Sequence, residues 1–177
     1  MKVIISIILL LVFNSLYCQV DSTTYQFLID IINRKSDTTV LIYTEKIHPE
    51  MFDNKPYLKK ITKSEIVDEK KLIKLNQREY KYIKEQWGQL KNHEWPANLF
   101  INSLRIKTDS LAEFLHQDRS RVVYLISKPI FIRNNSIALV HYSRLCCGGI
   151  YGPDEVIFYK KENDRWKKWV FVSQGAF

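Results

Sequence analysis

The pattern of the chain changes at Arg121, and this change constrains the fold more than any other feature of the sequence. Beyond it, runs rich in β-branched and aromatic residues are separated by turn residues, as in a series of strands. The runs are residues 122–126, 130–133, 137–146, 155–161 and 165–172. The pair Asn134-Asn135 tolerates the positive φ angles of a tight hairpin, and residues 162–164 supply a second turn. Because tight turns join antiparallel neighbours, these runs predict an antiparallel C-terminal β-meander.

Before Arg121, two segments have the sequence pattern of a capping box at the N-terminus of a helix. In a capping box, a polar side chain and a glutamate three residues later form hydrogen bonds to each other's backbone. Asn76 and Glu79 form the first pair, and Ser110 and Glu113 form the second. The helix that begins after Asn76 has an apolar stripe at helical spacing, which predicts that it packs on a sheet. The stripe consists of Tyr80, Ile83, Trp87 and Leu90.

Residues 21–44 predict a further helix and one strand. Asp21 or Ser22 can cap a helix that runs to about Arg34. Residues 38–44 are β-branched and apolar, which favours a strand, whereas residues 64–74 fit a strand or a helix. Helices first and strands after them predict a single α+β domain, with two to three helices packed on one face of the antiparallel meander.

The N-terminus predicts export. Lys2 precedes a run of eleven residues, 3–13, that is apolar except for Ser6, and a polar break follows at Asn14-Ser15. A helix needs about 20 apolar residues to cross a bilayer, so this run is too short for that role. Residues 1–18 are therefore interpreted as a signal peptide and residues 19–177 as the mature domain.

Cys18 leaves two interpretations of the processing site. Cleavage after Cys18 makes Gln19 the first residue and releases a periplasmic or secreted protein. A cysteine at this place can instead carry the lipid of a bacterial lipoprotein. Such signals usually have a small residue before the cysteine, and this chain has the bulky Tyr17. Cleavage before Gln19 is the favoured interpretation, with a lipid anchor at Cys18 as the alternative.

The chain is basic, with 27 lysine and arginine residues, 19 acidic residues and a formal net charge of +8. Loss of residues 1–18 removes one lysine, Lys2, and leaves the mature domain with 26 basic residues and a formal charge of +7. An exported protein meets anionic envelope polymers, glycans, lipid headgroups and acidic proteins, but no nucleic acid. The alternative is an ordinary solvated surface, because the basic residues are scattered among acids.

Four segments of the C-terminal third carry a resemblance to known proteins. They are residues 127–131, 137–142, 147–152 and 160–167. Together they resemble the closing hairpins of small exported proteins of Bacteroidetes-type bacteria, a group without an established activity. The resemblance implies a fold and an export route, and no chemistry. Its members usually carry a second cysteine in the loop where this chain has Tyr151, so the resemblance does not extend to a disulfide across that loop.

The loop from Cys147 to Asp154 is the candidate binding site. A glycine-rich loop between two strands can present aromatic and charged groups to a ligand. The candidate residues are Tyr142, Arg144, Cys146, Cys147, Tyr151 and Asp154. Asp154 and Glu155 could hold a proton or a cation, although acids at a strand edge usually provide solubility.

Cys146 and Cys147 allow three interpretations. They can be small apolar residues at a strand end, a strained vicinal disulfide in an oxidising compartment, or a nucleophile. Adjacent strand residues point to opposite faces, so the two thiols cannot share a metal ion. His141 precedes Cys146 by five residues, so it points to the opposite face. It is about 20 Å from Cys147 along a regular strand, and the pattern therefore predicts no thiol-histidine pair.

No residues in the chain have the spacing of a known catalytic or metal site, and none implies a cofactor. The sequence therefore predicts an exported, non-enzymatic binding or interaction protein of the cell envelope, without a transmembrane segment in its mature form. One alternative is a small periplasmic hydrolase or redox protein that uses Cys146 or Cys147. Another is an immunity-type inhibitor of an envelope toxin, which size, export and the lack of catalytic residues suggest.

Overall fold

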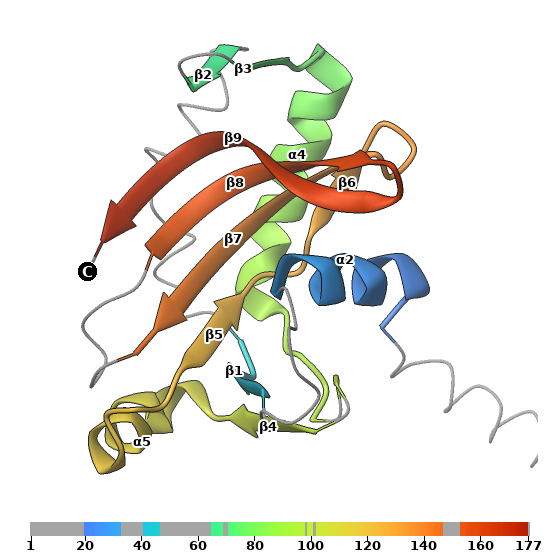
Figure 1. Ribbon diagram of the computed structural model, residues 1–177. Coiled ribbons are helices and arrows are strands. Elements are labelled where there is room, and N and C mark those ends of the chain that lie inside the picture. The colour runs from blue at the N-terminus through green and yellow to red at the C-terminus, as the bar shows by residue number, and fades with distance from the viewer. Residues whose placement is uncertain are drawn as a thin grey trace, which may run out of the picture.

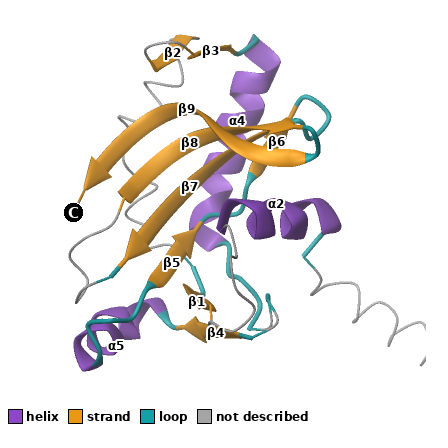
Figure 2. Ribbon diagram, in the orientation of Figure 1, coloured by secondary structure: helices purple, strands orange, loops and turns teal. Residues whose placement is uncertain are grey.

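The computed structural model describes residues 20–32, 41–46, 65–68, 71–97, 99–100, 102–146 and 153–176. These residues form an α+β fold with three α-helices and a mixed seven-stranded sheet, which confirms the predicted fold class (Figures 1 and 2). The predicted signal peptide and its processing site, Cys18 and Gln19, lie outside the described residues. None of the described helices is long and apolar enough to span a membrane.

The strands gather into one large sheet and one small hairpin. The helices are α2 (Ser22–Ile32), α4 (Gln77–Gln89) and α5 (Leu111–Gln117), with 3₁₀ turns η2 (Leu90–Asn92) and η3 (Thr108–Ser110). The strands are β1 (Leu41–Thr44), β2 (Glu65–Asp68), β3 (Lys71–Lys74), β4 (Ser103–Ile106), β5 (Val123–Ile126), β6 (Ile130–Ile132), β7 (Ile137–Leu145), β8 (Pro153–Glu162) and β9 (Arg165–Ala176). The large sheet has the order β4-β1-β5-β7-β8-β9, with β6 also paired to β7, while β2 and β3 pair with each other.

The C-terminal strands form the predicted antiparallel meander (Figure 1). Both β5 and β6 pair with β7, β6 with residues 137–139 and β5 with residues 142–145. Where β5 ends, the Ser127 hydroxyl oxygen accepts the backbone N–H of His141 at 2.9 Å and satisfies a donor that the interrupted strand leaves open. The predicted first turn is confirmed, because Asn134 and Asn135 have φ angles of 54° and 59°.

Two short strands extend the sheet in parallel, which the sequence pattern does not predict. β1 pairs in parallel with both β4 and β5. β1 falls within the strand predicted over residues 38–44, but no strand is predicted over β4. β4 alternates polar and apolar residues, but over only four positions, and Leu104 is 45% exposed, so its apolar residues do not form one buried face. The ambiguous residues 64–74 contain the β2-β3 hairpin.

Helices cover both faces of the sheet, so the expectation of helices on one face holds for only two of them (Figure 1). α4 and α5 share one face, where Trp87 and Leu115 pack in one cluster with Leu139 of β7. α2 lies on the other face, where Phe27 packs in a second cluster with Val140 of β7. The reason is that β7 is buried at successive residues and not only at alternate ones, so both of its faces need a cover.

The helix starts follow two of the three predicted caps. In α2, Asp21 Oδ1 accepts the backbone N–H of Thr24 at 2.8 Å. In α4, Asn76 and Glu79 form the complete capping box, with hydrogen bonds of 2.9 and 3.0 Å. The predicted box at α5 is wrong, since the Ser110 side chain makes no capping hydrogen bond. Because η3 precedes α5 directly, Ser110 lacks the extended backbone that a capping residue needs.

His93 is expected to make the stability of the protein depend on pH. Its Nε2 atom is buried without a hydrogen-bond partner among the described residues, and burial together with the charge of Lys128 lowers the pKa of His93 from 6.5 to about 4. The unfolded chain therefore takes up this proton at a higher pH than the folded chain, and the free energy of unfolding falls as the pH falls from 6.5 to about 4.

Urea unfolding across that pH range measures the effect. The wild type should lose up to about 1 kcal/mol per pH unit relative to His93→Gln, which cannot take up the proton. His116→Gln is the matched control, because His116 is exposed at the end of α5 and its replacement should leave the slope unchanged. Equal slopes for the wild type and His93→Gln would contradict the prediction.

Candidate functional site

Two of the six residues predicted to bind a ligand lie outside the described part of the chain. Cys147 and Tyr151 are outside it, and Cys146 follows β7 in a partly buried position. The use of a cysteine as a nucleophile therefore stays a prediction from the sequence.

The other predicted residues lie on two different faces of the sheet. Tyr142 and Arg144 are two residues apart on β7, and Tyr142 belongs to the cluster on the α2 side. Asp154 of β8 stands opposite Ser143, so it points to the face that α4 and α5 cover. The structure therefore does not bring Tyr142 and Arg144 together with Asp154.

Tyr142 takes part in a mostly buried group of charged and aromatic side chains. Lys168 Nζ donates a hydrogen bond of 2.6 Å to Glu155, which is 4% exposed, and also lies 5.7 Å from the centre of the Tyr142 ring. Burial raises the pKa of Tyr142 from 10 to about 12. These contacts hold the sheet together on the α2 side, and Glu155 is a buried ion-pair partner instead of a solvated edge acid.

Asp154 pairs with His141 on the opposite face. Asp154 Oδ1 is 2.5 Å from His141 Nε2, and the two side chains are 16% and 1% exposed. Ser143 is fully buried beside them, and its hydroxyl has no hydrogen-bond partner among the described residues. Serine, histidine and aspartate are the residue types of hydrolytic triads, but here the aspartate occupies Nε2 and the serine is closed to solvent. We interpret the His141-Asp154 pair as structural.

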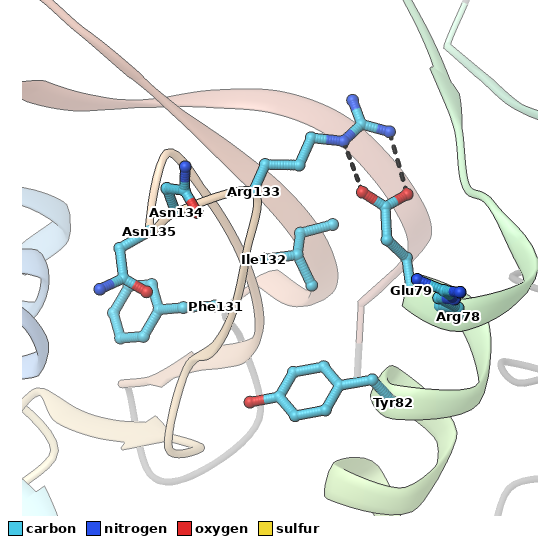
Figure 3. A pocket seen from close by; sticks show the side chains of 8 residues that line it. All are labelled: Arg78, Glu79, Tyr82, Phe131, Ile132, Arg133, Asn134 and Asn135. Atoms are coloured by element: carbon cyan, nitrogen blue, oxygen red, sulfur yellow. Dashed lines mark hydrogen bonds and ion pairs between the residues drawn. The ribbon is translucent and has the colours of Figure 1, made fainter.

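A groove between α4 and the β6-β7 hairpin is the best candidate for a functional site (Figure 3). It has a volume of about 410 Å³ and opens to solvent. We call it the α4-β6 groove. Its lining residues are Arg78, Glu79, Tyr82, Phe131, Ile132, Arg133, Asn134 and Asn135.

One ion pair fixes the two walls of the α4-β6 groove to each other. Arg133 donates two hydrogen bonds to the carboxylate of Glu79, of 2.8 and 3.2 Å, and a third to the backbone carbonyl of Lys74 (Figure 3). The Arg133 hydrogen bond lowers the pKa of Glu79, and Glu79 in turn raises the pKa of Arg133. Because Glu79 also closes the capping box of α4, a single carboxylate anchors the helix start and the hairpin turn together.

The groove lies against the edge of β6 and not on a face of the sheet. Successive strand residues point to opposite faces, and the groove is lined by both Phe131 and Ile132, which point to opposite sides of the strand in Figure 3. On its other edge β6 pairs with β7. Tyr82 extends its ring from α4 toward β6 and is 44% exposed. The groove therefore runs between a helix and the outer edge of a strand.

The chemistry of this lining suits binding better than catalysis. The lining has no histidine, cysteine or serine, and Arg133 holds its only carboxylate, Glu79. The groups that remain are the Tyr82 ring and hydroxyl, the Arg78 guanidinium and two asparagine amides. The described part of the chain also contains no group of histidine, cysteine and acidic residues that could hold a metal ion.

The sequence predicts each wall of the groove, but not that the walls meet. The Asn76-Glu79 box and the Asn134-Asn135 turn are recognisable in the chain. Their contact joins Glu79 to Arg133, 54 residues apart, and no local signal links the two.

Replacing Glu79 by alanine tests the anchor. The free energy of unfolding should fall by about 1–2 kcal/mol near neutral pH, because the capping box and the Arg133 pair are both lost. The folded-state pKa of Glu79 is lowered from 4.5, so its contribution is present above that value and is lost as the pH falls through the lower folded-state pKa. Urea unfolding should therefore show the wild type and Glu79→Ala converging in acid.

Glu85→Ala is the control, because Glu85 lies on the same helix and, among the described residues, forms only an exposed pair with Lys81 at 3.9 Å. Its effect should stay below about 0.5 kcal/mol. A difference between the wild type and Glu79→Ala that stays constant into acid would contradict the assignment.

Comparisons of the chain with protein-family models, with curated proteins and with solved structures find no match. Fold and groove together define an α+β protein with a helix-strand groove of mixed aromatic and polar lining. The groove is therefore interpreted from its own geometry and charge.

Proposed function

We propose that the protein is exported and acts as a non-enzymatic binding protein of the cell envelope, with the α4-β6 groove as its binding site. The observation that carries this proposal is a solvent-open groove whose two walls are fixed to each other by the Glu79-Arg133 pair. A site with a fixed shape loses little conformational entropy when a ligand binds, which favours recognition. Export is supported by the apolar run at residues 3–13.

Charge favours an anionic partner. The mature domain carries a formal net charge of +7, and an opposite charge on the partner would speed their encounter. Within the groove, Arg78 forms no ion pair with any described residue, whereas Arg133 is paired with Glu79. A carboxylate or another anionic group on the ligand would meet the Arg78 guanidinium.

Partner capture tests this proposal. Immobilised protein, residues 19–177, is incubated with a detergent extract of the host's envelope, and retained proteins and glycans are identified by mass spectrometry. We expect at least one component whose retention falls about tenfold or more with Tyr82→Ala, as for a central aromatic contact. A toxin among such components would make inhibition of that toxin the form that binding takes.

Lys84→Ala is the matched control, because Lys84 is exposed on α4 but does not line the groove. It should retain the same components as the wild type. Equal retention by the wild type and by Tyr82→Ala would show that the groove is not the binding site.

A further inference from the structure

We infer that the α4-β6 groove binds an extended polypeptide segment with an acidic side chain, which adds as a further strand to the outer edge of β6. This inference rests on the proposed function of the groove and names the class of its ligand. Three features of the groove carry it: the open edge of β6, the alternating side-chain environment along that edge, and the free charge of Arg78.

The first feature is the outer edge of β6. β6 pairs with β7 through Ile130 to Ile132, and no other strand in the described part of the chain pairs with it. In an antiparallel pair, alternate residues direct their N–H and C=O groups at the partner. Of three successive residues, at least one therefore directs these groups to the outer edge, where the groove lies. An extended peptide is a ligand that satisfies such groups along its whole length.

The second feature is the spacing of side chains around this edge. Phe131 and Ile132 point to opposite sides of β6, and Tyr82 faces the same edge from α4 (Figure 3). A strand placed there would direct alternate side chains toward Tyr82 and away from it. Side chains with a period of two then supply specificity, while the backbone hydrogen bonds supply a part of the affinity that does not depend on sequence.

The third feature is charge. Arg78 lines the groove without an ion pair among the described residues, and the asparagine amides of the hairpin turn offer further donors. The one acidic side chain in the lining, Glu79, is already bonded to Arg133. A ligand with a glutamate or aspartate would place its carboxylate against Arg78, whereas a basic segment would be repelled.

A peptide set with a movable charge tests the inference directly. The probes are fluorescein-labelled octapeptides of alternating valine and threonine, each with one glutamate at a different position, and binding is measured by fluorescence anisotropy. We expect the register that sets glutamate opposite Arg78 to bind best, and Arg78→Glu to weaken it about tenfold or more. The same peptide with lysine in place of glutamate should recover binding to Arg78→Glu. Lys84→Glu is the control and should leave binding to the glutamate peptide unchanged.

The backbone of the peptide tests strand addition itself. N-methylation of alternate peptide amides in one phase should abolish binding, and methylation in the other phase should be tolerated, because a strand pairs on one side only at every second residue. Amide hydrogen exchange should show new protection in β6, residues 130–132, when the peptide is bound.

Each contrary outcome overturns the inference. Peptides that bind equally in both N-methylation phases would show recognition by side chains alone. Protection of β6 that rises with protein concentration in the absence of peptide would assign the edge to a second copy of this chain. Displacement of the best peptide by an envelope oligosaccharide would assign the groove to glycans. If none of these peptides binds while Tyr82→Ala still lowers the retention of an envelope component, the inference of strand addition is wrong and the proposed binding function is kept.

Discussion

Asp154→Ala is expected to lower the free energy of unfolding by about 3 kcal/mol, since it leaves the buried Nε2 of His141 without its acceptor. The two side chains are 2.5 Å apart at Oδ1 and Nε2, and His141 is 1% exposed. An ionised carboxylate only accepts hydrogen bonds, so the proton of this contact lies on the imidazole. Without the carboxylate, that N–H loses its acceptor on a side chain that is 1% exposed. Urea unfolding near neutral pH measures the loss.

Asp154→Asn separates the hydrogen bond from the charge. The asparagine oxygen still accepts the imidazole N–H, so this variant should lose only about 1 kcal/mol. The pair of variants also separates a structural role from a chemical one, because sites arranged for catalysis often gain stability when their polar residues are removed. A stabilised Asp154→Ala variant would contradict our structural interpretation of the His141-Asp154 pair.

Trp87→Ala is expected to cost about 4 kcal/mol, which is a large part of the stability of an ordinary domain. Trp87 is 1% exposed and lies in the core cluster that α4 and α5 build on one face of the sheet. Alanine leaves a large cavity at the centre of this face, because the helix and the strands around it cannot collapse fully into the space. Thermal and urea unfolding should both show the loss.

Tyr82→Ala is the control on the same helix. Tyr82 is 44% exposed and lines the groove, so its removal should change the free energy of unfolding by less than about 0.5 kcal/mol. Together the two variants separate stability from binding: Trp87→Ala should affect stability, and Tyr82→Ala should affect partner retention. A loss of several kcal/mol on removal of Tyr82 would show that the groove wall is part of the core.

Local sequence patterns predict an element of this fold correctly where all the residues that specify the element lie within one short segment. The Asn76-Glu79 capping box is complete within four residues, and both of its hydrogen bonds form. The turn at Asn134-Asn135 depends only on the tolerance of asparagine for positive φ, and both residues adopt it. The pattern fails at Ser110, because the 3₁₀ turn before α5 changes the backbone that the cap requires.

The pairing of segments that are distant in the chain could not be predicted from the sequence. β4 alternates polar and apolar residues over only four positions, which is too short a signal to identify a strand, and its place beside β1 depends on a parallel contact with a segment far away in the sequence. The position of α2 depends on β7 being buried on both faces, which short-range periodicity shows only as a continuous apolar run. The candidate residues around Asp154 are separated for the same reason: the β7-β8 register decides which face each one joins.

The sequence by itself determined the fold class, the antiparallel meander, the start of α4 and the basic charge, because each follows from residues within one segment or from composition. Only the tertiary structure decided that Asp154 pairs with His141 and that Glu79 meets Arg133 at the groove. These contacts depend on how sheet register and helix packing place segments that are distant in the chain. Side-chain chemistry is local, but the partner of a side chain is set by the fold.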